Sequence, residues 1–446
     1  MPITPADRRM LLLVLNPDRP ALAQEYVPPP VGCADAIVGD LSGIPQANLK
    51  VLLVGARGGG KSSEMREIER RLITGHGLFV STVDLRASGV SPGRLSAFDL
   101  LYMAGLSILC GLPRDDAARA LFNELARAYA GDKSPELGSL DENGDRLVSF
   151  ATAAAAAAAL FGAGIKSQGV DIEVAGAAAG AAVTGLGAVG GMILGSRKQG
   201  VVPETSTEGR TLLDVCTRIA RARRGPSGAH LCIMIDGLEE MNGESDERFR
   251  QIFEQTALLS MAPWSAVIAA PPCTLTETKS VEGRGYSTYP VWGFRPEEPE
   301  RLIQLLDQRC RAAGVDPADE SAVEPGALGR IANGAGTLPR HAVYIAQRAV
   351  LAMGTSTRLT IEHAEKGLQF FGERLCLPLT TEDIDLLARV DRTGELPGEE
   401  SAARLFADGR IIVCPPAHGT RVPRWTVHPL ILPEVRAARG GRDGPV

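Results

Sequence analysis

Several features that mark common protein classes are scarce in this 446-residue sequence. Aromatic residues make up only 4% of it, so the interior must be packed mainly with aliphatic side chains. The eight cysteines are scattered singly, without a Cys-x-x-Cys pair or a ligand-like spacing to histidine, which argues against a zinc site and a disulfide framework. The net charge of -6 argues against a strongly basic surface for nucleic acid. A reduced, cytoplasmic setting fits these features best.

The N-terminal region also lacks a convincing secretion signal. Arg8 and Arg9 precede the apolar run 11–15, but this run is too short for a signal peptide and stops at the polar turn 16–18. We therefore expect a cytoplasmic protein.

One stretch carries a specific motif. The apolar run 51–54 leads directly into Gly55-Ala-Arg-Gly-Gly-Gly60-Lys61-Ser62, which matches the pattern G-x-x-x-x-G-K-S. A helical pattern with Met65, Ile68 and Leu72 on one face follows. A strand, a glycine-rich loop and a helix in this order predict a phosphate-binding loop, or P-loop.

The residue types of this loop suit phosphate chemistry. Glycines let the backbone turn tightly, so that successive N–H groups point at phosphate oxygens, and the positive end of the following helix adds its field. We expect Lys61 to neutralise the β- and γ-phosphates and the Ser62 hydroxyl to bind Mg²⁺. The loop residues expected to hold the nucleotide are Gly55, Gly58, Gly59, Gly60, Lys61, Ser62 and Ser63.

A second part of the site is predicted at the end of another apolar strand. The run 231–235 ends in Asp236-Gly-Leu-Glu239-Glu240. We expect this strand to lie next to the P-loop strand, which would make Asp236 the second Mg²⁺ ligand. One or both of Glu239 and Glu240 would orient or deprotonate the attacking water. The expected catalytic residues are therefore Lys61, Asp236, Glu239 and Glu240.

The remaining patterns of this region predict an α/β fold with a parallel sheet as the core of a P-loop NTPase. Further buried strands are expected at 78–85, 264–270 and 289–294, with helical patterns between them. We assign residues 1–294 to this nucleotide-binding domain. Because the interval between Lys61 and Asp236 is far longer than a compact strand–helix–strand unit needs, residues 100–205 are expected to be an insertion within it.

The insertion contains a stretch of unusual composition at 148–196. Seven consecutive alanines are followed by an uncharged run rich in Gly and Ala from 174 to 196, which is long enough to span a bilayer as a helix. Its Gly-x-x-x-Gly spacings allow close helix contacts in membranes. However, Ala and Gly contribute little transfer free energy, and many glycines weaken a helix. Both a membrane contact and a soluble, protein-facing insertion therefore stay open.

The C-terminal part is predicted to form two further domains. Residues 295–374 carry successive helical patterns, which indicate a helical lid. Residues 375–438 follow the order helix, helix, strand, turn, strand, helix, which is typical of a winged-helix domain. The tail 439–446 is expected to be disordered.

Three further motifs resemble those of the STAND-type P-loop NTPases, the signal-transduction branch that includes NACHT and NB-ARC modules. The sequence Asp236-Gly-Leu-Glu239-Glu240 is similar to the NACHT pattern D-G-x-D-E. The element Gly336-Thr-Leu-Pro339-Arg340 resembles the family's G-x-P element, with one extra residue between Gly and Pro. Val427-His428-Pro429 resembles the M-H-D motif, with Pro429 in place of the aspartate.

This resemblance implies a role for each matching residue. Pro339 would lie against the adenine, Arg340 would stabilise charge on the phosphates, and His428 would read the β-phosphate of bound ADP. The protein would then be an ATP- and Mg²⁺-dependent molecular switch with slow hydrolysis, in bacterial signalling or defence. No sensor repeats and no effector domain are recognisable in the sequence, so an unidentified protein partner or the insertion would supply input and output. Self-association stays open.

Two alternatives belong to other functional classes. One is a membrane effector ATPase that releases residues 148–196 into a bilayer. The other is an AAA+ ATPase that handles DNA, of the loader type, because such proteins also end in winged helices. The second winged-helix helix contains Glu399 and Glu400 and the domain has no excess of basic residues, which argues against nucleic acid as a partner.

Overall fold

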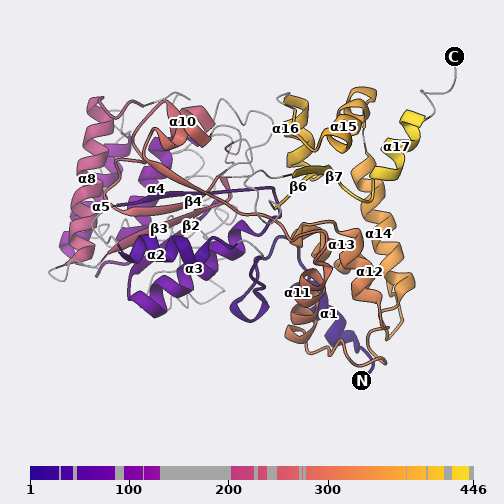
Figure 1. Cartoon of the computed structure of the whole chain (residues 1–446). Coiled ribbons are helices and arrows are strands. Elements are labelled where there is room, and N and C mark those ends of the chain that lie inside the picture. Colours follow the sequence, from indigo (N-terminus) through magenta and orange to yellow (C-terminus); the bar gives the residue numbers. More distant parts are fainter. Residues whose placement is uncertain are drawn as a thin grey trace, which may run out of the picture. The chain divides into compact units, whose positions relative to one another are not determined.

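The structure is a computed structural model (Figure 1). By their contacts the residues fall into two compact units: unit 1 comprises residues 1–34, 55–67 and 290–446, and unit 2 comprises residues 35–54 and 68–289. The N-terminal residues 1–34 thus group with the C-terminal helices, and the expected boundary at residue 294 falls close to the limit at residue 290. The structure describes all residues except 30–31, 44–47, 86–94, 114, 131–201, 226–229, 239–248, 271–273, 275–277, 378, 398–399, 416–423 and 441–446.

Unit 2 is built on a five-stranded sheet with the strand order β2-β3-β4-β1-β5. The pairs β1–β4, β3–β4 and β2–β3 are parallel. The strands are β1 (Lys50–Val54), β2 (Phe79–Asp84), β3 (Leu231–Asp236), β4 (Ser265–Ala270) and β5 (Tyr286–Pro290). The α/β fold predicted from the sequence is therefore confirmed.

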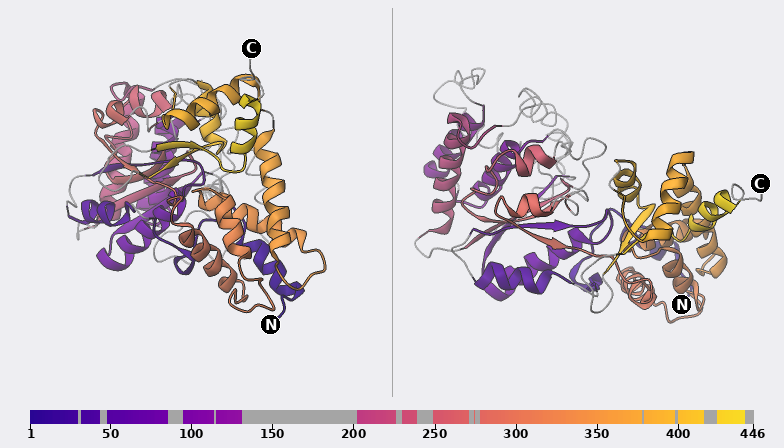
Figure 2. Two further views of the ribbon diagram at one scale, coloured as in Figure 1. Left: turned by 45° about the vertical axis from the view of Figure 1, so that its right-hand side comes forward. Right: turned by 45° about the horizontal axis from the view of Figure 1, so that its top comes forward.

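The buried strands β1, β3 and β4 are covered on both faces. All their residues are buried, which is why they read as continuous apolar runs rather than as alternating patterns. In Figures 1 and 2, α2 and α3 lie on one face of the sheet, and α4, α5 and α8 lie on the other. These helices are α2 (Ala34–Gly43), α3 (Lys61–His76), α4 (Ala97–Leu109), α5 (Asp116–Ala130) and α8 (Thr207–Arg224).

One expectation about the sheet is wrong. We expected the strand that ends at Asp236 to lie next to the P-loop strand, but β4 lies between β1 and β3. Ala266 of β4 is the register partner of both Lys50 in β1 and Ile233 in β3. Chain order gives no information about this placement, because any parallel strand can be inserted between two others through its crossover connection.

The last strand and one helix also differ from the prediction. A strand was expected at 289–294, but β5 covers Tyr286–Pro290, so the aromatic residues after it belong to the next segment. A helix was expected at 246–259; a five-residue π-helix, η6 (Arg250–Glu254), lies there, and residues up to 248 are outside the described part. A short helix, α10 (Thr278–Glu282), precedes β5.

The described part of the expected insertion belongs to the core of unit 2. Helix α4 begins with a capping box, in which Ser96 and Asp99 bond reciprocally, and nearly all of its residues are buried. It packs against α5, α8 and β2. Phe98 and Tyr102 of α4 both stack on Tyr129 of α5. The Ala/Gly-rich stretch 148–196 lies outside the described residues.

Unit 1 contains the N-terminal helix and the first four helices of the C-terminal half. Helix α1 packs against α11 and α13, and the short helix η1 packs against α11. The helices are α1 (Pro5–Val14), η1 (Ala23–Glu25), α11 (Pro299–Ala312), α12 (Ala327–Gly334), α13 (Pro339–Ala352) and α14 (Ile361–Cys376). The helical patterns predicted for 295–374 are therefore observed, while a lid function for them stays a prediction.

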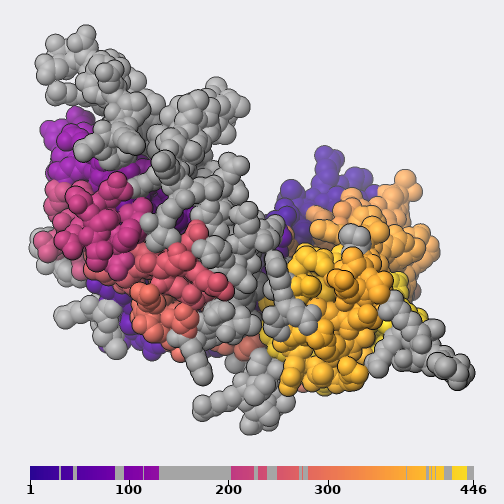
Figure 3. Space-filling view, turned by 90° about the horizontal axis from the view of Figure 1, so that it is seen from above, coloured from indigo at the N-terminus to yellow at the C-terminus, as the bar shows by residue number. Residues whose placement is uncertain are grey.

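The C-terminal segment has the five elements that the sequence predicts, in the predicted order. They are α15 (Thr381–Thr393), α16 (Glu400–Ala407), the antiparallel pair β6 (Ile411–Cys414) and β7 (Arg424–Val427), and α17 (Leu432–Gly440). Figure 3 shows their residues, in orange to yellow, gathered in one compact body. The winged-helix name for this segment stays a prediction, and the tail beyond residue 440 is outside the described residues.

Among the described helices, none combines the length and the apolar character that crossing a membrane requires.

Candidate functional site

The P-loop has the backbone that its glycines predict. Strand β1 ends at Val54, the loop Gly55–Gly60 follows, and α3 begins at Lys61. Gly58 and Gly60 have φ values of +80° and +106°, in a region that side chains with a Cβ rarely adopt. The first turn of α3 closes on the loop, because the N–H groups of Ser63 and Glu64 both donate to the Gly60 carbonyl.

Two of the loop glycines also allow close approach of other segments of unit 1. A Cβ on Gly55 would collide with the carbonyl oxygen of Val291. A Cβ on Gly58 would lie 2.5 Å from the Cβ of Arg340, and the Arg340 N–H donates to the Gly58 carbonyl at 3.2 Å. The loop is therefore held from two sides, by the chain after β5 and by the start of α13.

Lys61 is buried and directed back over the loop. Its Nζ donates to the carbonyls of Gly55 at 2.9 Å and Ala56 at 3.1 Å, and the residue is 3% exposed. A buried positive charge at the start of a helix, after a glycine-rich turn, is suited to bind an anion.

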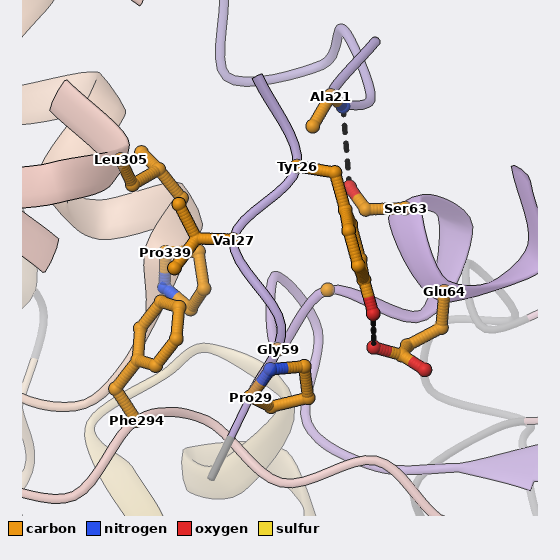
Figure 4. Close-up of a pocket in the computed structure, with 11 residues that line it drawn as sticks. Ala21, Tyr26, Val27, Pro29, Gly59, Ser63, Glu64, Phe294, Leu305 and Pro339 are labelled. Carbon is orange, nitrogen blue, oxygen red and sulfur yellow. Dashed lines mark hydrogen bonds between the residues drawn. The ribbon is translucent and has the colours of Figure 1, made fainter. Parts of the chain in front are cut away.

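The chain between α1 and α2, which we call the N-terminal segment, lies along the first turn of α3. The Ala21 N–H donates to Ser63 Oγ at 3.2 Å, the Tyr26 hydroxyl donates to Glu64, and the Cys33 thiol lies 3.7 Å from the other carboxylate oxygen of Glu64 (Figure 4). Glu64 is 1% exposed. Burial, and then the Glu64 carboxylate, raise the pKa of Tyr26 well above its usual range, so its hydroxyl remains the proton donor of this pair.

A pocket with an empty volume of about 340 Å³ opens between these segments. In Figure 4, Val27, Phe294, Leu305 and Pro339 form one side of it, and Tyr26, Ser63 and Glu64 form the other. Gly59 and Gly60 of the P-loop line it as well, together with Ala21 and Pro29. Mostly apolar walls with a few convergent polar groups are typical of small-molecule sites.

A buried arginine holds the N-terminal segment in this position. The Arg309 guanidinium, on α11, donates to the carbonyls of Val14 and Arg19. Arg19 in turn pairs at 2.7 Å with Glu25, which is fully buried. Burial lowers the pKa of Arg309 to about 10, so the group still carries its charge near neutral pH. Arg309 thus positions the wall of the pocket from α11.

Pro339 and Arg340 lie beside the P-loop. Pro339 is the first residue of α13 and lines the pocket. The Arg340 guanidinium forms an ion pair with Asp18 of the N-terminal segment. Its predicted contact with phosphate stays a prediction.

His428 is completely buried and does not line this pocket. Its Nδ1 accepts from the Leu430 N–H at 3.3 Å, and its ring lies 5.0 Å from that of His341 and 5.7 Å from that of Phe371. Burial lowers the pKa of His428 to about 3 and that of His341 well below its usual value. The backbone of Ala335 raises the pKa of His428, but by less than burial lowers it. Among the described residues, none forms a well-aligned hydrogen bond with the Nε2 of His428. Its phosphate-reading role stays a prediction.

The element Gly336–Arg340 and the motif Val427–Pro429 lie next to each other. Gly336, with φ of +68°, lies so close to Pro429 that a Cβ on it would be 3.2 Å from the proline ring. The turn that precedes Pro339 therefore packs on the residue that follows His428. This contact joins the start of α13 to the corner between β7 and α17.

In unit 2, Asp236 ends β3 and is 8% exposed. Its register partner in the neighbouring strand is Asp84, the last residue of β2, and the Leu85 N–H donates to the Asp236 carbonyl. Asp84 was not among the predicted site residues. Like Asp236, it is an acidic residue at the carboxyl end of a strand. Glu239 and Glu240 lie outside the described residues.

Sequence reasoning missed several pocket residues. Tyr26 and Val27 lie in a segment that looked like a proline-rich connector, and Phe294 was expected to be part of a strand. Glu64 alone had a local signal, because it directly follows the G-K-S-S end of the motif in the first turn of the helix.

No protein-family model matches the chain, and no curated protein matches it. Among solved structures, it is similar to one described as "Structure of Drosophila ORC bound to DNA", with 11% sequence identity, a TM-score of 0.40, and coverage of 98% of this chain and 94% of that chain. A similarity this weak carries no functional argument. The fold and the site define an α/β protein with a P-loop.

Proposed function

We propose that this protein binds ATP and ADP at the P-loop and works as a slowly hydrolysing molecular switch similar to the STAND NTPases. The observation that carries the proposal is the pocket beside the P-loop, whose walls come from the N-terminal segment, α3, α11 and the start of α13. A ligand that fills it contacts segments far apart in the sequence.

The lining suits the two ends of a nucleotide. Gly59, Gly60 and Ser63 offer a glycine-rich turn and a helix start, which suit phosphates. Phe294 and Pro339 offer apolar surface for a base. The positive φ of Gly58 and Gly60 and the buried Lys61 fit an anionic ligand rather than an apolar one.

The catalytic roles follow the sequence motifs. Lys61 would neutralise phosphate charge, and Ser62 and Asp236 are the proposed ligands of Mg²⁺, which would supply charge neutralisation at the phosphates. Glu239 or Glu240 would take a proton from, or orient, the attacking water. Arg340, which is paired with Asp18 here, would add positive charge at the phosphates.

A switch needs a part of the molecule that responds to the bound nucleotide. Arg340 touches Gly58 of the P-loop, and the turn before it packs on Pro429. A nucleotide that shifts the start of α13 would thus change a contact with the C-terminal segment. The two arrangements would differ in their affinity for ATP and ADP, as any nucleotide-driven population shift requires.

Nucleotide content and turnover of the purified protein test this proposal. We expect ADP to be released on denaturation of the wild type, turnover with ATP and Mg²⁺ slower than about one per minute, well below typical enzyme rates, and neither property in Lys61→Ala. Lys366→Ala, which removes a surface lysine of α14 paired with Glu362, is the matched control. An empty site with fast turnover would contradict the switch, and nucleotide retained by Lys61→Ala would contradict the site.

The biological setting is a separate proposal that rests on the resemblance. A defence or signalling switch of bacteria would require an unidentified protein partner as sensor or effector. Cells that produce wild type or Lys61→Ala should then differ in survival after phage challenge, and equal survival would count against this setting.

A further inference from the structure

Helices α13 and α14 of unit 1 carry a surface that the proposed nucleotide site does not use. Tyr344, Arg348 and Leu351 follow at spacings of four and three residues and therefore share one face of α13. Phe370 and Arg374 share one face of α14 in the same way. The two helices pack against each other, and none of these five residues lines the pocket. We call this set the α13–α14 patch.

The arginines of the patch are held by aromatic rings. The Arg348 guanidinium carbon lies 4.3 Å from the ring centre of Phe370 and 5.0 Å from that of Tyr344, and its NH2 group donates to the Tyr344 hydroxyl at 3.0 Å. The Arg374 guanidinium lies 5.1 Å from the centre of the same tyrosine ring. Stacking of this kind fixes the planar groups without neutralising their charge.

Neither arginine has an acidic partner among the described residues. The positions three and four residues away from Arg348 and Arg374 within their own helices hold apolar or aromatic residues, so no ion pair along either helix can form. The nearby carboxylates of α14 bind elsewhere: Glu362 to Lys366, Glu365 to Arg330, and Glu373 to the Gln369 amide. Arg374 is exposed, and Arg348 is half-buried with its NH2 group on Tyr344, so both guanidinium groups keep donors for an anionic group.

Exposed apolar side chains lie beside these charges. Phe370 is 46% exposed and Leu351 is 50% exposed, although large apolar residues of the helical segment are otherwise mostly buried. Leu351 follows Arg348 by one turn, and Phe370 lies under the Arg348 guanidinium. Aromatic residues and arginine together are typical of the energetic centres of protein interfaces.

We propose that the α13–α14 patch docks an acidic, amphipathic segment of a partner protein. Carboxylates of the segment would pair with Arg348 and Arg374, and its apolar side chains would cover Leu351 and Phe370. Charge complementarity favours this occupant. A nucleic acid fits less well, because its phosphate backbone has no apolar side chain that could cover Leu351 and Phe370.

Binding of defined probes by fluorescence anisotropy tests the patch. The probes are a labelled 18-residue helical peptide with leucines on one face and glutamates on the other, the same peptide with glutamine in place of glutamate, and a 20-nucleotide oligo(dT). We expect the glutamate peptide to bind most tightly and to weaken as salt is raised. Arg348→Gln combined with Arg374→Gln should lower its affinity about tenfold or more, because both positive charges that would pair with the glutamates are removed.

The matched control is Arg311→Gln combined with Arg330→Gln, which removes the same charge from arginines that already have acidic partners. It should bind the peptide like the wild type. Leu351→Gln should weaken binding of the glutamate peptide without changing the far-UV circular dichroism spectrum. Equal affinities for the two peptides, equal loss in both double variants, or tighter binding of oligo(dT) would overturn the proposal. All these proteins keep Lys61 and the residues that line the pocket. A difference in peptide binding between them therefore does not come from a changed nucleotide site.

Discussion

At the scale of single residues, two glycines of the P-loop share a left-handed backbone but differ in their surroundings. A Cβ on Gly58 would meet the Arg340 side chain at 2.5 Å, whereas a Cβ on Gly60 would meet nothing within 4 Å. The positive φ alone costs about 1–2 kcal/mol for a residue with a Cβ. The comparison of the two sites therefore separates backbone strain from the contact with α13.

We predict that Gly58→Ala destabilises the protein more than Gly60→Ala. Gly60→Ala should cost about 1 kcal/mol from backbone strain, and Gly58→Ala about 1–3 kcal/mol more because the start of α13 must move. Denaturant unfolding of the full chain, followed by circular dichroism, measures both. Equal losses would show that the contact between Gly58 and Arg340 contributes nothing.

Lys50, at the start of β1, offers a second prediction. Its Nζ donates to the carbonyls of Asn48, Ala262 and Trp264, and burial lowers its pKa to about 7. Between pH 7 and 10.5 the unfolded chain binds a proton here that the folded chain has lost. The contribution of this lysine to stability therefore rises with pH, by at most about 1.4 kcal/mol per pH unit.

The variant Lys50→Met lacks this contribution. The difference in unfolding free energy between wild type and Lys50→Met should increase from pH 7 to pH 9.5, as measured by urea titration at each pH. Lys366→Met, at an exposed ion pair, is the control and should give a difference that hardly changes with pH. A constant difference for Lys50→Met would refute the lowered pKa.

At the scale of elements, a pair of buried histidines joins α13 to the corner between β7 and α17. His341 and His428 are both at least nine-tenths buried, and in the described part of the chain His341 Nδ1 and His428 Nε2 have no hydrogen-bond partner. A Cβ on Gly409, which precedes β6, would collide with the His341 ring. The contact between the C-terminal segment and α13 thus depends on two neutral imidazoles.

Acid should weaken this contact. The unfolded chain binds a proton at position 428 below pH 6.5, but the folded chain does so only near pH 3. The stability that the neutral ring contributes is therefore complete above pH 6.5 and is lost as the pH falls toward 3. The loss has a slope of up to about 1.4 kcal/mol per pH unit.

We predict that His428→Asn unfolds at lower denaturant than wild type at pH 7 but loses less stability between pH 7 and pH 4. Asparagine is suitable because its Oδ1 can accept from the Leu430 N–H in place of Nδ1. His76→Asn, at an exposed helix end, is the control and should keep the wild-type pH profile. An unchanged profile in His428→Asn would mean that this imidazole does not titrate below its usual pKa.

At the scale of the whole molecule, nucleotide binding should stabilise the protein by mass action. At a nucleotide concentration one hundred times Kd, the gain is about 2.7 kcal/mol. We therefore predict that ADP and ATP raise the midpoint of thermal unfolding of the wild type by a few degrees. Lys61→Ala should show no rise, and Lys366→Ala a full one. A rise in Lys61→Ala would place the binding site away from the P-loop.

Local patterns in the chain were enough to predict most strands, most helices and the glycine-rich loop between β1 and α3. Each depends on neighbours in sequence: apolar runs for strands buried on both faces, 3.6-residue periodicity for helices, and glycines where φ must be positive. Hence Gly58 and Gly60 have positive φ values, and α15 to α17 follow in the predicted order with β6 and β7.

Long-range packing decided the rest. The insertion of β4 between β1 and β3, the seating of Tyr26 on Glu64, and the use of Phe294 as a pocket wall join residues far apart in the chain. No periodicity or motif encodes such pairs, because each depends on how separately formed elements share one interior. For the same reason the sequence did not show that the His428 ring lies against those of His341 and Phe371.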